Sequence, residues 1–237
     1  MSNSPPFTVF ADLSVLVDYC IVYLDKNRYA EQVLNEIQDQ GGSVVTSSSA
    51  KNDLNDRIAD RQRLLDYLIN EASRCISEES NPVTAFSSGV LNYPDLQTAS
   101  GVSFNSSHLP DLSGLAEHLE NVGIHEFRND LDDWRIQANH LRKNLYLNVI
   151  DDTYEKGGQS QFTLAATLSS ASRDQCQVEC LVNAAYWCQS HGDSVLVSNE
   201  CGVYEERERI SKAMSQIANS DIDMVSPMEI VEDMDII

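Results

Sequence analysis

The chain has 237 residues, of which 42% are hydrophobic, so it is long enough for one large domain with its own core. Lys and Arg number 16 against 37 Asp and Glu, which gives a formal net charge of −21. That charge repels phosphate backbones and argues against a non-specific nucleic-acid binder. Two origins fit it: a surface adapted to high salt, where screening removes long-range repulsion, or an ordinary acidic protein whose substrate is not nucleic acid.

The first residues show no basic segment followed by an apolar one, so we expect no signal peptide. No apolar run approaches the length of about 20 residues that a membrane span needs. We therefore expect a cytoplasmic chain that does not associate with a membrane. In that setting a disulfide framework is not expected, and no CxxC pair occurs among Cys20, Cys75, Cys176, Cys180, Cys188 and Cys201.

The first third of the chain alternates apolar strand patterns with helical ones. Apolar, partly β-branched residues over Thr8–Tyr19 predict a buried strand that is interrupted by Asp12. A helical stripe covers Tyr29–Ile37. A short strand over Ser43–Thr46 follows, and Ser47–Ser49 offers N-caps for a long helix.

The middle of the chain changes character. Residues 77–110 are rich in Ser, Asn, Pro and Gly, which indicates a loop or lid. Helical patterns return over Leu112–Leu119 and Phe127–Val149. We therefore expect one domain whose core spans about 7–76 and 161–237, with a loop and helical insertion at about 77–160.

The last third returns to alternating elements. A helix is predicted over Ser172–Gln189, a buried strand over Ser194–Ser198 and an exposed helix over Glu205–Ile217. Met224-Val225 predicts a last strand, and Pro227 opens a final helix. Helices that alternate with apolar strands predict an α/β fold, a three-layer sandwich around a mostly parallel sheet.

Acidic residues occur where such a sheet would collect them. Ligands bind at the carboxyl ends of parallel strands. Asp12 lies in the first apolar run, Asp53 follows the second strand and Glu200 follows the Ser194–Ser198 strand. Asp174 begins the preceding helix on its apolar face, with Glu179 as its rival. Oxygen ligands of this kind suit Mg²⁺ or Mn²⁺.

Asp12 with Ser14 in one segment, and Ser198, Asn199 and Glu200 in another, resemble two motifs of a known family, the PIN domain, from the PIN-like nuclease superfamily. Its first motif is an Asp in the first strand with a hydroxyl residue close behind, which Asp12 and Ser14 match. Its last motif is a hydroxyl residue, a small polar residue and Asp, which Ser198, Asn199 and Glu200 match with Glu in place of Asp. The resemblance covers roughly residues 7–70 and 172–231, and the acidity suits a halophilic archaeon.

The resemblance implies a metal-dependent ribonuclease that hydrolyses phosphodiester bonds. Mg²⁺ or Mn²⁺ would be held by Asp12, Asp53, Asp174 and Glu200, with Glu179 as the alternative third acid and Ser14, Ser198 and Asn199 in support. RNA would be the substrate, and an antitoxin or RNA-processing factor a protein partner.

Alternatives remain beside this hypothesis. Asp53 stands where the family usually has Glu, and a methylene more or less moves a carboxylate by about an ångström, which weakens a metal site. The alternative is therefore a catalytically degenerate PIN-like domain that binds protein or RNA. Separately, Asp12 itself has an alternative interpretation, as a structural acid that accepts backbone hydrogen bonds. A phosphatase with an Asp nucleophile is disfavoured, because Asp12-Leu13-Ser14 lacks the second Asp.

Overall fold

The computed structural model describes residues 8–21, 25–77, 109–156, 160–169, 175–191 and 194–235. Its centre is a five-stranded sheet in the order β3-β2-β1-β4-β5, and every pair of neighbouring strands is parallel. The strands are β1 (Thr8–Ala11), β2 (Ser43–Ser47), β3 (Ile150–Tyr154), β4 (Val195–Val197) and β5 (Asp223–Val225). The parallel sheet confirms the α/β prediction.

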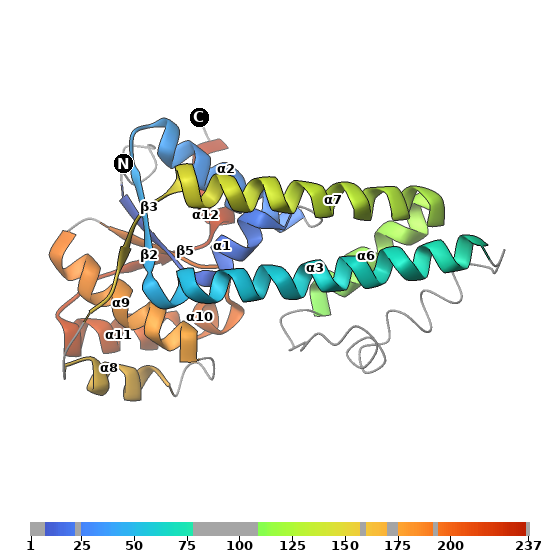
Figure 1. The fold of residues 1–237 in the computed structure, drawn as a ribbon. Coiled ribbons are helices and arrows are strands. Elements are labelled where there is room, and N and C mark those ends of the chain that lie inside the picture. Colours follow the sequence, from blue (N-terminus) through green and yellow to red (C-terminus); the bar gives the residue numbers. More distant parts are fainter. Residues whose placement is uncertain are drawn as a thin grey trace.

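Helices cover both faces of the sheet, which explains why its central strand is apolar from Val9 to Ala11. Val9, Phe10 and Ala11 of β1 are fully buried. Figure 1 shows two groups of helices on opposite sides of the strands. One group contains α1 (Leu13–Cys20), α2 (Asp25–Asp39) and α12 (Pro227–Asp235). The other contains α8 (Ser160–Leu168), α9 (Gln175–His191) and α11 (Arg207–Ala218), and the short α10 (Cys201–Glu205) precedes α11.

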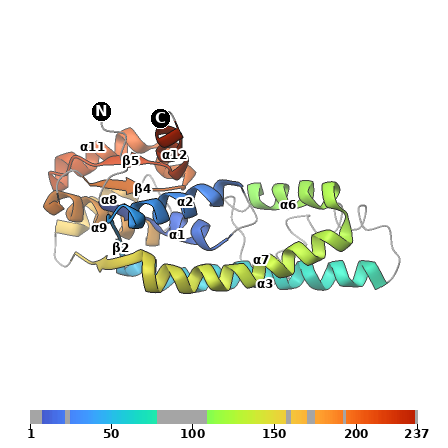
Figure 2. The same ribbon diagram turned by 90° about the horizontal axis from the view of Figure 1, so that it is seen from above.

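A helical arm, which consists of the outer half of α3 with α6 and α7, extends from the sheet (Figures 1 and 2). The helices are α3 (Ser48–Ser77), α6 (Leu109–Val122) and α7 (Ile124–Asn144), and a π-helical turn (Leu145–Val149) joins α7 to β3. The arm has its own hydrophobic cluster, in which Leu68 and Phe127 are fully buried. Among the described helices, α3 included, none has the length and apolar character to cross a membrane.

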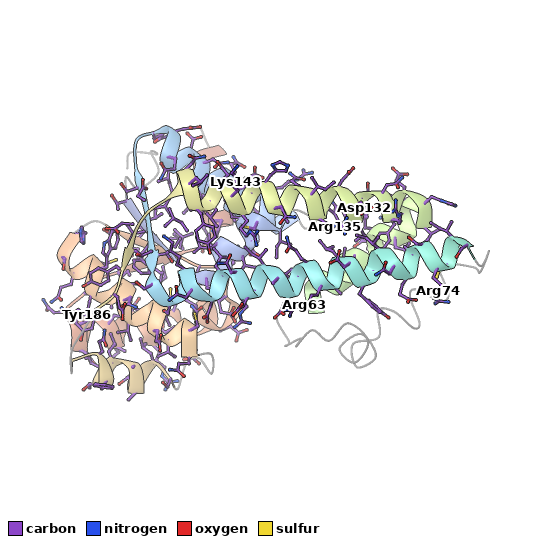
Figure 3. The ribbon with its side chains drawn as sticks, in the orientation of Figure 1. Arg63, Arg74, Asp132, Arg135, Lys143 and Tyr186 are labelled. Atoms are coloured by element: carbon purple, nitrogen blue, oxygen red, sulfur yellow. The ribbon has the colours of Figure 1, made fainter. Side chains whose placement is uncertain are left out.

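One ion pair joins α3 and α7 on the surface of the arm. Arg135 of α7 lies between the two helices (Figure 3). Its Nη1 is 2.7 Å from Asp66 Oδ1 on α3, and its Nη2 is 3.1 Å from Asp132 Oδ1 on α7. The start of α3 follows the predicted capping, since Ser47 Oγ accepts a hydrogen bond of 3.0 Å from Ala50 N.

The prediction of one strand over Thr8–Tyr19 was wrong. The strand ends at Ala11, and α1 begins at Leu13. The cause is Asp12, whose side chain accepts a hydrogen bond from Val15 N and thereby caps the helix. A buried helix is apolar on nearly every side, so its sequence resembles that of a buried strand.

Strand β3 lies inside the range that was predicted to be an insertion. It pairs with β2 along Ile150–Tyr154 and so belongs to the sheet. Its exposed Asp151 and Asp152 hide it from an apolar pattern, because β3 is an edge strand. Asp151 Oδ2 accepts a hydrogen bond of 2.7 Å from Val44 N. The expected loop at 77–110 falls almost wholly outside the described residues.

Candidate functional site

The predicted residues Asp12 and Ser198 lie at the carboxyl ends of β1, the central strand of the sheet, and of its neighbour β4. The chain leaves β1 toward β2 on one side, while β4 lies on the other, so this is the switch point where open α/β sheets bind ligands. Asp12 follows β1 and its backbone N donates to Val197 O at 3.1 Å. Ser198 follows β4 and its backbone N donates to Val225 O at 3.0 Å.

The Asp12 carboxylate is fully buried and accepts four hydrogen bonds. Oδ1 accepts from Ser14 Oγ at 2.6 Å and from Val15 N at 3.1 Å. Oδ2 accepts from Gln177 Nε2 at 3.1 Å and from Ser198 Oγ. A carboxylate has about four acceptor positions. Every one of them is therefore filled by a donor from α1, α9 or the end of β4.

Burial dominates the electrostatics of this acid. Desolvation raises the pKa of Asp12 above its usual value of 3.8, and the hydrogen bonds from Ser14, Ser198, Val15 and Gln177 lower it only in part. Cys180 of α9 lies close enough for the carboxylate to add to the effect of burial, which raises the pKa of the thiol well above its usual value. In both groups burial therefore shifts the protonation equilibrium toward the neutral form, relative to the same group in water.

The two serines connect Asp12 to the turn after β4. Ser14 Oγ accepts a hydrogen bond of 2.8 Å from Asn199 N, and Ser198 Oγ accepts one of 3.1 Å from Glu200 N. Each hydroxyl thus donates to Asp12 and accepts from the backbone of the turn. Asn199 Nδ2 donates to Asp18 Oδ2 at 2.8 Å, which ties the same turn to α1. We call Asp12, Ser14, Gln177, Ser198 and Asn199 the strand-end cluster.

The structure brings together some of the predicted residues and not others. Asp12 lies together with the three supporting residues Ser14, Ser198 and Asn199, and Glu200 is half-buried in the turn beside them. Asp53 is half-buried in the first turns of α3. It is not among the hydrogen-bond partners of Asp12, which are Ser14, Val15, Gln177 and Ser198.

The choice between the two candidates for the third acid is not settled by the described residues. Asp174 lies outside them. Glu179 is exposed on α9 and accepts a hydrogen bond of 3.0 Å from Gln175 Nε2. The residue of α9 that does reach Asp12 is Gln177, which the sequence reasoning missed. Gln177 lies three and four residues before Cys180 and Leu181, so it shares the buried face of the helix with them. It was missed because only acidic residues were considered as candidates for the site.

The described residues do not fit a divalent metal ion. No group of three or more His, Cys, Asp or Glu side chains within them is arranged to hold one. Mg²⁺ and Mn²⁺ need free carboxylate oxygens. Both oxygens of Asp12 are occupied by hydrogen-bond donors, and the carboxylate has no exposed surface.

Comparison with family models, with curated proteins and with solved structures finds no match for this chain. The chemistry of the strand-end cluster therefore follows from its own geometry: a buried acid saturated by neutral donors, at the position where this type of sheet binds ligands.

Proposed function

We propose that the chain is a catalytically silent PIN-like domain that acts as a protein-binding module. The observation that carries this proposal is the closed environment of Asp12. In a metal site the acids are held with surplus negative charge, which an ion then neutralises. Here the Asp12 carboxylate accepts hydrogen bonds from four uncharged donors instead, and it connects α1, α9 and the turn after β4.

The PIN-like part of the proposal is supported by the positions of the motif residues. Asp12 and Ser14 follow β1, Ser198 and Asn199 follow β4, and the two pairs are hydrogen-bonded to each other. β1 and β4 are neighbours in the parallel sheet. Residues that are 186 positions apart in the chain thus meet as the resemblance implies.

Protein is favoured over RNA as the partner because of charge. With 16 basic against 37 acidic residues, the chain offers few cations to phosphates. An acidic surface attracts basic partners and speeds their association.

A metal-dependent ribonuclease is the second candidate. It is favoured by the meeting of Asp12, Ser14, Ser198 and Asn199 at the switch point, where a substrate would bind. In this proposal Asp12, Asp53, Asp174 and Glu200 would hold Mg²⁺ or Mn²⁺, and the ion would supply Lewis-acid chemistry toward the phosphate and water. Asp174 lies outside the described residues, so this ligand set stays a prediction.

One experiment separates the two candidates. The full chain is melted with increasing Mn²⁺, in low and high salt, and incubated with a labelled single-stranded RNA of mixed sequence. Asp12→Asn is the test variant, and Asp133→Asn, which changes an exposed acid of α7, is the control. A silent domain cleaves no RNA, and both variants melt with the same Mn²⁺ dependence as the parent. Cleavage that only Asp12→Asn abolishes, with loss of a Mn²⁺-induced rise in Tm, establishes the ribonuclease instead.

A further inference from the structure

We propose that a cleft between the start of α3, α8 and α9 binds a basic, extended peptide segment of a partner protein. The proposal deepens the protein-binding function above and rests on it. The cleft has a volume of about 820 Å³ and lies beyond the carboxyl ends of β2 and β3. We call it the α3–α9 cleft.

Its walls come from segments that the fold brings together. Ser48 and Asn52 belong to the first turns of α3, and Phe162 and Ala165 belong to α8. Val178 and Val182 lie four residues apart on α9, so they share one face of that helix. Because α8 packs on α9 while α9 packs on α3, the three walls are fixed relative to one another.

The charge in the cleft favours a cation. Glu155 follows β3 and Glu179 stands on α9. Neither forms an ion pair with any Lys or Arg among the described residues. Lys156 is the only basic residue in the described lining, and its Nζ lies 5.1 Å from the centre of the Tyr186 ring, a residue labelled on α9 in Figure 3. Within the described lining, two carboxylates thus stand against one ammonium group, and this excess of negative charge favours a Lys or Arg of the partner.

The rest of the lining suits a peptide. Phe162 is 72% exposed, so its ring gives a partner side chain an apolar surface to pack on. Ser48, Asn52 and Gln161 carry donors and acceptors that can pair with peptide N–H and C=O groups.

Other ligands fit less well. A phosphate-bearing ligand, RNA included, meets two carboxylates here and is repelled. The volume lies within the range of roughly 300–1,000 Å³ that is usual for ligand pockets, so it admits a few residues of extended chain but not a folded element. A short basic segment satisfies the size, the charge and the exposed aromatic ring together.

The test uses the full-length protein and a set of fluorescent nine-residue peptides. Each carries two Lys or Arg among Leu, Phe and Ser, and each has a partner peptide in which Glu replaces the basic residues. Binding is measured by fluorescence anisotropy at low and high salt. The protein variants are Glu155→Gln with Glu179→Gln, and Phe162→Ala; Glu126→Gln, an exposed acid of the arm, is the matched control.

We expect some basic peptides to bind and their Glu-containing partners not to bind. Removal of both carboxylates should weaken binding about tenfold or more, as loss of charge-assisted contacts does, while Glu126→Gln changes it less than about twofold. Bound peptide should slow hydrogen exchange in α8 and α9.

Three results would overturn the proposal: equal binding of acidic peptides, equal weakening by Glu126→Gln, or binding of a short oligouridylate in place of peptide. These outcomes are distinct from RNA cleavage or Mn²⁺ binding, which test the silent site at Asp12 and not the cleft.

Discussion

Replacement of Asp12 by Ala distinguishes a structural acid from a functional one. A carboxylate that serves as a metal ligand repels the neighbouring carboxylates when no metal is bound, and so destabilises the metal-free fold. Its removal therefore leaves the free energy of unfolding unchanged or raises it. Asp12 instead caps α1 and accepts hydrogen bonds from three other side chains. We therefore expect Asp12→Ala to destabilise the protein.

The size of the loss follows from the groups left behind. Ser14 and Ser198 can turn their hydroxyls, but Gln177 Nε2 and Val15 N lose their acceptor in a buried place. A buried donor without a partner costs about 1–3 kcal/mol, and loss of an N-cap costs about 1 kcal/mol. Relief of the desolvated charge offsets part of this. The net loss should be about 2–4 kcal/mol at neutral pH.

Urea denaturation followed by circular dichroism measures the effect without any metal in the buffer. Asp56→Ala, which changes an exposed acid of α3, is the control and should stay within about 0.5 kcal/mol of the parent. Asp12→Asn keeps one acceptor oxygen and should fall between the two. If Asp12→Ala matches the control or is more stable than the parent, the structural role of Asp12 is wrong.

Three further predictions concern the same cluster and the arm. The pKa of Asp12 is raised on folding, so its contribution to stability should be fully present below about pH 4 and be lost as pH rises through the folded pKa, by about 1.4 kcal/mol for each pKa unit; Asp12→Asn should remove this part of the pH dependence in urea denaturation, and Asp133→Asn should not. Gln177→Glu should bring a second carboxylate to the place where Nε2 now lies 3.1 Å from Asp12 Oδ2, lowering Tm at neutral pH and making it rise with Mn²⁺; no response to Mn²⁺ would count against the geometry. Phe127→Ala should cost about 3–5 kcal/mol and speed hydrogen exchange in the arm, with β1 and β4 unaffected; equal loss throughout the chain would show that the arm does not unfold by itself.

The apolar patterns of the sequence predicted most of the helices and strands, because the residues of each such element themselves favour that secondary structure. Three elements show this: the Ser43–Thr46 strand, the long helix after Ser47 and the strand at Val195. The two strands are rich in β-branched residues, the helix has apolar residues at helical spacing, and all three have clear boundaries. Strand β3 was missed because its sequence lacks the apolar pattern of a strand. It is stabilised by its pairing with β2, where the side chain of Asp151 accepts a hydrogen bond from the backbone N of Val44. A polar edge strand is recognisable only once its neighbour is known.

The position of the candidate residues at strand ends could be predicted from the sequence, but the side chains that surround Asp12 could not. Asp12, Ser14 and Ser198 stand at strand ends, and parallel topology brings strand ends together. Whether Asp12 meets other acids or neutral donors depends on which face of α9 turns inward. That face presents Gln177, while Glu179 two residues later is exposed.

The hydrogen bonds of Asp12 also define what metal binding there would require. An ion needs at least one carboxylate oxygen, so either Ser14 and Val15 N or Gln177 and Ser198 would have to release it. Release of Val15 N uncaps α1, and release of Ser198 frees the turn that also holds Glu200 N. Each path exchanges satisfied buried groups for unsatisfied ones, at about 1–3 kcal/mol for each group. The binding free energy of an ion must exceed the sum of these costs. A peptide in the α3–α9 cleft would leave the hydrogen bonds of the strand-end cluster intact.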